Sequence, residues 1–243
     1  MLDRARKDAS LSGTTWNEAP AKPAGDKNCT LCRGFGYIMT QKEPLTYREC
    51  ECRKKKRSLD SLQRAGMTDM AGRYSMETYL ADTPRRQAIK ETAQRFIEAD
   101  RGWFFIGGRS GSGKTHICTA ICTKLIEKGG SELYFMSWRD ESTELKFCMK
   151  DFERYKTRLN KLKTVPILYI DDFFKGGANE ADLRLAFEIL NARYNNSALR
   201  TILSSELDLE AIAELDEAIG GRILERSRGF AVKAPAENMR LRQ

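Results

Sequence analysis

The chain has 243 residues, 41% hydrophobic and 31% charged, which suffices for one large or two modest domains and excludes wholesale disorder. Its 42 Lys and Arg against 34 Asp and Glu give a formal net charge of +8, which suits a polyanionic partner but also simply disfavours precipitation. No apolar run approaches the ~20 residues that cross a bilayer, and the N-terminus lacks the apolar segment of a secretory signal, so the sequence predicts a cytoplasmic protein without a membrane partner.

The front of the chain carries most of the basic surplus. The first 60 residues contain 13 Lys and Arg against 8 Asp and Glu. Residues 1–28 are rich in Ala, Pro, Lys, Thr and Asp and show no hydrophobic period. They are therefore predicted to form a flexible tail.

Residues 29–58 are predicted to form a small zinc-binding module. Cys29 and Cys32 form one close thiol pair, and Cys50 and Cys52 form a second after 17 intervening residues. A hairpin in between would bring the two pairs together as a tetrahedral Zn²⁺ site. The C-x-C spacing of the second pair weakens the match, and four unliganded cysteines are the alternative. So small a module, however, has little core without a metal.

The module ends in a basic run, Arg53–Arg57, which is either a solvated helix start or a contact for nucleic acid or a docking protein. Residues 59–80 are predicted to be a linker. Thr83 can then cap a helix with Pro84 at its first position, which begins a second domain predicted over residues 81–243.

A phosphate-binding loop follows the apolar strand Trp103–Ile106. Gly108-Arg-Ser-Gly-Ser-Gly-Lys-Thr115 matches the G-x-x-x-x-G-K-T pattern, in which glycines let backbone N–H groups face a phosphate at the start of a helix. Lys114 is predicted to reach the β- and γ-phosphates of a nucleotide, and the Thr115 hydroxyl to ligate Mg²⁺. A glycine-rich turn with a chance lysine is the alternative, which the strand-loop-helix order disfavours. The predicted nucleotide-binding residues here are Gly108, Arg109, Ser110, Gly111, Ser112, Gly113, Lys114 and Thr115.

The helix after this loop carries Cys118 and Cys122 on one apolar stripe, which predicts core packing. Leu133–Met136 is predicted to be the second strand of the domain. Trp138–Lys163 has apolar residues at helical spacing, Cys148 among them, and is interpreted as one long amphipathic helix. Its basic face is either solvated or a wall of a nucleic-acid channel.

A second motif places two acids after an apolar strand at Val165–Ile170. Asp171 is predicted to hold the Mg²⁺ shell and Asp172 to polarise the attacking water, although two acids at a strand end can also be a simple turn. Another strand, Thr201–Ser204, ends in Ser205 and Glu206. Strands alternating with helices predict a parallel α/β sheet that binds the nucleotide at the carboxyl ends of its strands, and hence an ATPase.

Taken together, these motifs resemble the bacterial helicase loaders of the DnaC/DnaI type, which are AAA+ ATPases. The likeness spans about residues 60–243, and the front cysteine module looks like the zinc-binding domain with which some loaders hold the helicase. The resemblance implies a sheet order of 5-1-4-3-2 without a C-terminal lid, ATP as nucleotide, and an oligomer that opens a hexameric replicative DNA helicase and delivers it to single-stranded DNA. Besides the loop, the resembling stretches are Ile170–Phe173, Ile202–Glu206, Gly220–Arg226 and Asn238–Leu241.

The same likeness implies further site residues. Arg222 falls at the arginine finger, which reaches a neighbouring subunit's ATP, and Arg240 at the sensor 2 arginine. Glu206 stands at the sensor 1 position near the γ-phosphate, where the family usually has Asn, and Asp172 stands where Glu is more common. Both departures predict slow hydrolysis that a partner or DNA stimulates.

Two other functions compete with the loader. A transposition helper ATPase of the IstB type has a similar core and binds duplex DNA, but it usually lacks a cysteine module at the front. A non-catalytic zinc adaptor would bind nucleotide without turning it over. The four front cysteines favour the loader over the first rival, and only ATP turnover excludes the second.

Overall fold

The computed structural model describes residues 25–42, 45–129, 132–148 and 150–239. Most of the predicted tail and the predicted sensor 2 residue Arg240 lie outside these described residues. Gly25 already belongs to the folded part, because its N–H donates to Gly34 O at 3.1 Å. Within the described ranges, no helix is long and apolar enough to cross a membrane.

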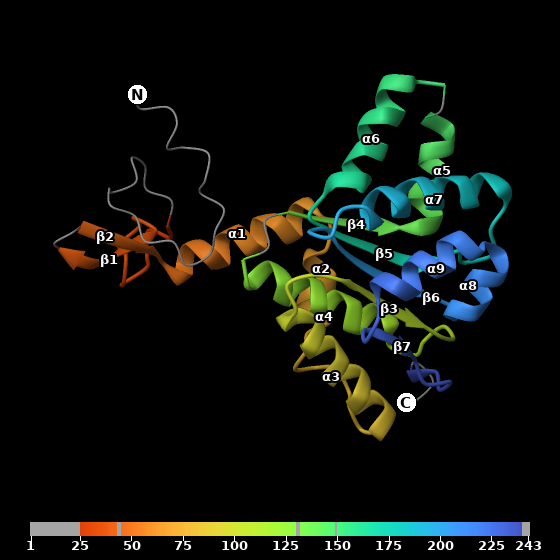
Figure 1. Ribbon diagram of the computed structural model, residues 1–243. Coiled ribbons are helices and arrows are strands. Elements are labelled where there is room, and N and C mark those ends of the chain that lie inside the picture. The colour runs from red at the N-terminus through yellow and green to blue at the C-terminus, as the bar shows by residue number, and fades with distance from the viewer. Residues whose placement is uncertain (1–24, 43–44, 130–131, 149, 240–243) are drawn as a thin grey trace.

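The cysteine module consists of a hairpin and the start of a helix. β1 (Tyr37–Lys42) and β2 (Leu45–Glu49) pair antiparallel, as the stretch between the two cysteine pairs predicts. α1 (Glu51–Arg64) begins directly after Cys50, so the second cysteine pair lies where strand and helix meet. The hairpin stands apart from the body of the protein and is joined to it by α1 (Figure 1).

The body is built on a five-stranded parallel sheet in the order β4-β5-β6-β3-β7. Numbered from β3, this is the 5-1-4-3-2 order that the resemblance implies, so the expected parallel α/β sheet is confirmed. The strands are β3 (Trp103–Gly107), β4 (Leu133–Ser137), β5 (Ile167–Phe173), β6 (Arg200–Ser205) and β7 (Ala231–Lys233).

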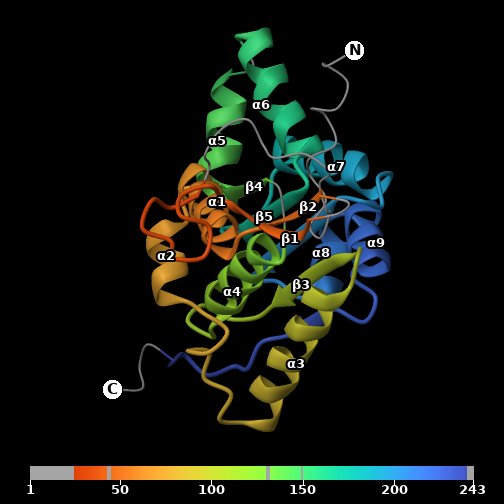
Figure 2. The ribbon, with the colours of Figure 1, turned by 90° about the vertical axis from the view of Figure 1, so that its left-hand side faces the viewer.

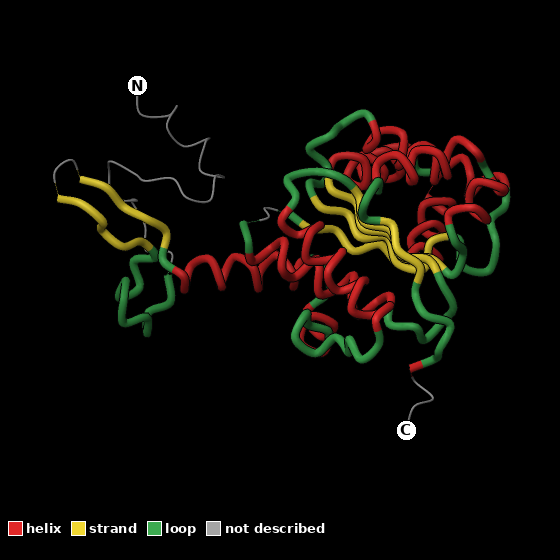
Figure 3. Tube along the Cα trace, turned by 60° about the horizontal axis from the view of Figure 1, so that its bottom comes forward, coloured by secondary structure: helices red, strands yellow, loops and turns green. Residues whose placement is uncertain are grey.

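Two layers of helices enclose this sheet (Figure 3). Trp103 and Phe105 of β3 pack in a cluster with α5 to α9, whereas Phe104 and Ile106 pack on the opposite face with α1 to α4. Successive strand side chains point to opposite faces, so a strand that is apolar at every position is buried on both. The remaining helices are α2 (Thr68–Arg73), α3 (Pro84–Glu98), α4 (Lys114–Glu127), α5 (Trp138–Cys148), α6 (Phe152–Thr164), α7 (Glu180–Tyr194), α8 (Leu209–Leu215) and α9 (Glu217–Arg226).

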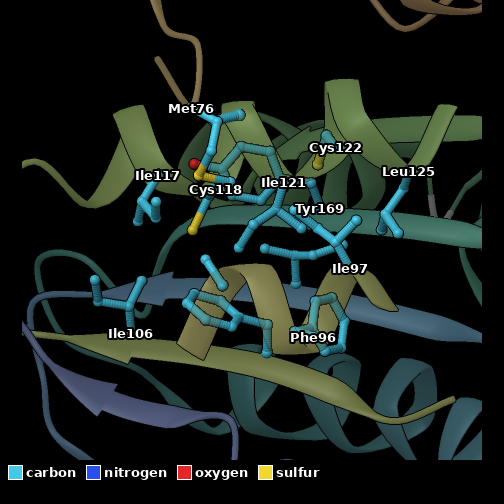
Figure 4. Close-up of a cluster of buried hydrophobic side chains, with 14 of the residues drawn as sticks. Met76, Phe96, Ile97, Ile106, Ile117, Cys118, Ile121, Cys122, Leu125 and Tyr169 are labelled. Carbon is cyan, nitrogen blue, oxygen red and sulfur yellow. The ribbon is translucent and has the colours of Figure 1, made fainter. Parts of the chain in front are cut away.

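The cysteines of α4 are core residues, as their stripe predicts. Cys118 and Cys122 are fully buried against the sheet, among the side chains of Ile121 and Tyr169 (Figure 4). Burial raises the pKa of both thiols, which therefore stay protonated and unreactive at neutral pH. These cysteines stabilise the face of the sheet that carries α4.

The prediction of one long helix over Trp138–Lys163 is wrong. The structure has two helices there, α5 and α6, which lie side by side and project from the body (Figures 1 and 2). Asp151 begins α6 by accepting a hydrogen bond from Arg154 N at 3.2 Å. An acidic N-cap of this kind starts a helix, and it outweighs the apolar spacing that continues across the break.

The predicted linker is part of the packed body. Leu62 near the end of α1 and Met67, Met76 and Tyr79 around α2 are buried in the cluster beneath α4. The segment shows no clear hydrophobic period because it consists of the end of α1, the short helix α2 and a turn. α1 therefore connects the cysteine module to the body as a continuous helix that is anchored at its far end.

Candidate functional site

The phosphate-binding loop has the backbone that its glycines predict. β3 ends at Gly107 and α4 begins at Lys114; between them Gly108, Gly111 and Gly113 have φ of 145°, 77° and 92°. Residues with a Cβ rarely adopt these values. Gly111 is further restricted, because a Cβ there would lie 2.0 Å from Asn238 Oδ1. The loop thus leads its N–H groups into the start of α4, the arrangement that binds anions.

Lys114 lies over this loop. Its Nζ donates to Gly108 O at 2.6 Å and to Arg109 O at 3.0 Å, and the side chain is buried. Burial lowers the pKa of Lys114, and the nearby carboxylates of Asp172 and Glu206 act in the opposite direction. A cation held between loop and acids is suited to the phosphates of a nucleotide.

The other predicted loop residues differ in role. Ser112 is buried and its Oγ donates to Arg109 O at 2.7 Å, so it holds the loop's own shape. Arg109 is exposed. Ser110 lines the cavity over the loop.

Asp171 and Thr115 face each other from the ends of β5 and α4. Thr115 Oγ1 lies 3.4 Å from both carboxylate oxygens of Asp171. The hydroxyls of Tyr169, at 2.6 Å, and Ser204 both donate to Oδ1 of the same carboxylate. A hydroxyl beside an oriented carboxylate offers the oxygen ligands that Mg²⁺ prefers, so these residues fit the predicted magnesium site.

Asp172 is set in place by a bulge. Ile170 pairs with Leu203 and Phe173 with Ser205, so two residues of β5 stand against Ser204 alone. The extra residue turns the backbone, and Asp172 has a φ of 54°, which is rare for a residue with a side chain. Its N–H donates to Ser204 Oγ at 3.1 Å. One serine of β6 therefore orients both acids.

A lysine that no sequence motif indicated, Lys175, bridges the carboxylates of Asp172 and Glu206. Lys175 Nζ donates to Asp172 Oδ2 at 2.7 Å and lies 3.4 Å from Glu206 Oε1. The two ion pairs raise the pKa of Lys175 and keep it charged.

Several of these groups line a cavity of about 220 Å³ above the loop, although Asp171 and Glu206 are not among its lining residues. It brings Lys114 and Thr115 together with Asp172, as the motifs predict. The full lining is Tyr74, Ser110, Gly111, Gly113, Lys114, Thr115, His116, Asp172, Lys175 and Met239. Tyr74 and Lys175 come from segments without a motif, so only the folded chain reveals them, whereas Met239 lies in the resembling stretch Asn238–Leu241.

His116 belongs to one wall of this cavity. Its Nε2 lies 2.9 Å from Ser75 O and 3.2 Å from Thr78 Oγ1, and its ring packs 5.0 Å from the ring of Tyr74. Burial lowers the pKa of His116. The histidine thereby ties the segment before α3 to the start of α4, and with Tyr74 it gives this wall of the cavity a partly aromatic surface.

Residues 237–239 form another wall of the cavity, which Met239 lines. Met239 N donates to Gly111 O at 2.8 Å, and Glu237 pairs with the fully buried Arg86 at 3.1 Å. Arg86 also pairs with Asp82. Residues 237–239 are thus held against the loop by an arginine of α3.

Arg222, the predicted arginine finger, does not reach this cavity. It lies on α9, where its Nε donates to Asn191 Oδ1 at 3.1 Å and its guanidinium stacks on Phe187 at 4.6 Å. Its surroundings are residues of α7 and α9, and the lining of the cavity does not include it. If Arg222 contacts ATP, that ATP would therefore have to be bound to another copy of the chain.

The four front cysteines form a cluster in which all Sγ atoms lie within 4.8 Å of one another. Cys29 Sγ and Cys50 Sγ are 3.7 Å apart, and Cys32 Sγ and Cys52 Sγ are 3.3 Å apart. Tetrahedral Zn²⁺ with Zn–S bonds of about 2.3 Å separates its sulfur ligands by about 3.8 Å. The thiols therefore fit a Zn²⁺ ion.

We expect the purified protein to contain one zinc ion per chain, measured by elemental mass spectrometry, and to lose it when Cys50 and Cys52 are replaced by serine. Loss follows because two sulfur ligands cannot complete a structural site. Cys148→Ser removes a buried thiol of the body and serves as control. An unchanged zinc content in the double variant would contradict the assignment.

A family model for IstB-like ATP binding proteins matches residues 36–243 of this chain. The matched region begins inside the cysteine module and includes the whole body, so it contains both acids, the loop and Arg222.

Individual proteins are similar to this chain over different shares of its length. YqaM of Bacillus subtilis (strain 168) is 27% identical and covers 80% of this chain, which spans 65% of YqaM's length. The replicative helicase loader DnaC of Escherichia coli (strain K12) is 24% identical over 80% of both chains. The ATP-binding protein of insertion sequence IS21 from Pseudomonas aeruginosa is 27% identical over 57% of this chain and 50% of its own.

Solved structures share the fold. The crystal structure of the DnaC helicase loader superposes with a TM-score of 0.59 at 21% identity and covers 68% of this chain and 99% of that one. The crystal structure of DnaI has a TM-score of 0.55 at 23% identity and covers 70% of this chain and 92% of that one. The parallel sheet and its helices therefore form a fold that this chain shares with these two proteins.

Proposed function

Because the chain belongs to the family of IstB-like ATP-binding proteins, we propose that it is an ATP-dependent loader of a hexameric replicative DNA helicase, which it delivers to single-stranded DNA. The observation that carries this proposal is the match to the helicase loader DnaC, which covers 80% of both chains. The match to the IS21 protein covers 57% of this chain and 50% of that protein. The loader therefore accounts for more of the molecule.

The nucleotide chemistry is assigned to the cavity above the loop. Lys114 and the loop N–H groups bind the phosphates of ATP, while Thr115 and Asp171 hold Mg²⁺, which would neutralise phosphate charge. Asp172 orients the attacking water, supported by Ser204 from the neighbouring strand. Tyr169 keeps the Asp171 carboxylate directed at Thr115. Hydrolysis of ATP follows from these roles.

Contact with single-stranded DNA is assigned to α5 and α6. Phe147 and Phe152, near the joint of the two helices, are 78% and 65% exposed. Lys156 Nζ lies 5.8 Å above the Phe152 ring, so a cation accompanies the aromatic surface. Exposed aromatic rings with lysines beside them are how proteins stack bases of single strands and follow their backbone.

Helicase docking is assigned to the cysteine module. Leu31, Phe35 and Met39 are large apolar side chains of this module that are 68%, 38% and 48% exposed. α1 separates the β1–β2 hairpin of this module from the body of the protein (Figure 1). A module that carries its own apolar surface on a helical stalk can bind a partner while the body binds ATP and DNA.

The test is a loading reaction with the hexameric replicative helicase of the same organism and circular single-stranded DNA. We expect the protein with ATP to raise the amount of helicase bound to the circle, measured by gel filtration. The variant with Cys50 and Cys52 replaced by serine is expected to lose helicase capture but still bind ATP, because the cavity lies in the body. Capture of a transposase on duplex DNA, with no effect on the helicase, would favour the transposition helper.

A further inference from the structure

The turn after β5 carries an unusual backbone. Asp172 and Phe174 have φ of 54° and 58°, and Gly176 and Gly177 follow with 85° and 96°. Lys175 N donates to Asp172 O at 3.0 Å, which closes the turn. Two residues with side chains in the left-handed region within three positions store strain, and such strain gathers at functional sites.

Aromatic packing holds this turn in place. Phe173 and Phe174 are buried and stack at 3.9 Å, and the Trp138 ring meets their edges at 4.8 Å and 5.3 Å. Neither phenylalanine can move without opening the core beneath α5. The exposed end of the turn is therefore fixed, and Lys175 is directed from it to the cavity, which its side chain lines.

The ammonium of Lys175 stands between two carboxylates at the phosphate cavity. Asp172 accepts from it at 2.7 Å, and Glu206 lies 3.4 Å away. Lys114 lies on the loop side of the same cavity. Without Lys175, Glu206 would lose this ion pair and add a negative charge close to Asp172, which lines the cavity assigned to the triphosphate.

We propose that Lys175 is a second phosphate-binding lysine: its ammonium contacts the terminal phosphate of ATP, and Glu206 holds it in place there. This rests on the proposed ATP-binding function and adds to it a residue that distinguishes ATP from ADP. Glu206, at the position where the family usually has Asn, then acts through the lysine and does not meet the phosphate itself. Lys175 stabilises the phosphate while Asp172 remains beside it to orient water.

Two readings of the ion pairs predict different results. If Lys175 binds the terminal phosphate, its loss weakens binding of ATP but not of ADP, which lacks that group. If Lys175 only neutralises Glu206, removing both charges restores ATP binding. The double variant Lys175→Met/Glu206→Gln therefore separates the two.

The experiment measures the dissociation constants of a non-hydrolysable ATP analogue and of ADP for the full chain with Mg²⁺, by calorimetry. We expect Lys175→Met to weaken the ATP analogue at least about tenfold and ADP less than about twofold, because a charge-assisted bond to phosphate is lost. Lys175→Arg is expected to recover part of the difference, and the double variant to stay defective. Lys128→Met, which breaks a lysine-glutamate pair with Glu98 outside the residues that line the cavity, is the control.

The proposal is overturned if both nucleotides weaken equally or if the double variant binds the ATP analogue like the unaltered protein. Melting temperatures of all variants check that each is folded. Since the readout is nucleotide binding, a protein that fails to load a helicase can still show the ATP-specific loss, and the two proposals fail separately.

Discussion

Replacing Lys114 by methionine is expected to lower ATP turnover by about 100-fold or more, because a preorganised cation at the phosphates stabilises charge in the transition state. In the structure Lys114 is buried and donates hydrogen bonds to Gly108 O and Arg109 O, so its position is set by the loop itself. Methionine keeps the apolar stem and removes only the charge. The measurement is phosphate release with Mg²⁺ and single-stranded DNA.

The control for this variant is Lys124→Met on the same helix. Lys124 pairs with Glu77 at 3.2 Å and with Glu127 at 3.3 Å, outside the residues that line the cavity. Its loss should leave turnover within about twofold, since exposed ion pairs contribute little. Absence of turnover in the unaltered protein itself, with the helicase present, would instead support the zinc adaptor that only binds nucleotide.

The loop and its strand could be predicted because their signals are local. Gly108, Gly111 and Gly113 occupy positions that need a positive φ, and β3 is apolar at every position because both of its faces are covered. The order of the sheet came from the resemblance, since the pairing of distant strands is not written in any local pattern. The structure confirms that order.

The rest of the candidate site depends on contacts between segments that are distant in sequence. Ser204 reaches both acids only because β6 lies beside β5 with a bulge, and the register of two strands is not visible in either one. Lys175 was missed because Asp172 and Phe174 adopt a conformation usually reserved for glycine. The one available signal was Gly176-Gly177, which marks a tight turn directly after the acids.

The break between α5 and α6 was missed for a related reason. Leu145, Cys148 and Phe152 keep helical spacing across it, and neither glycine nor proline interrupts the stretch. The informative residue is Asp151, which caps α6. A capping residue inside a periodic segment therefore indicates the start of a second helix. The break places Phe147 near the end of α5 and Phe152 at the start of α6, and both side chains are exposed.

Arg222→Ala is expected to lower turnover by about 1,000-fold or more, the scale of removing an arginine that reaches a phosphate from a neighbouring molecule, while ATP binding stays nearly unchanged. ATP binding should persist because Arg222 lies on α9, where it stacks on Phe187 and donates to Asn191. It does not line the nucleotide cavity of the same chain. Arg228→Ala, an exposed arginine just beyond the same helix, is the control and should retain turnover.

A mixing experiment decides whether the arginine acts between copies of the chain. Arg222→Ala has an intact loop and Lys114→Met has an intact arginine, so a mixed oligomer contains interfaces that carry both. With random mixing in a head-to-tail assembly, about one quarter of the interfaces are complete, and turnover should return to roughly that fraction. If two inactive variants stay inactive when mixed, although gel filtration shows that they assemble together, Arg222 does not act in trans. Recovery would also establish that the ATPase works as an oligomer, because no single copy in the mixture has a complete site.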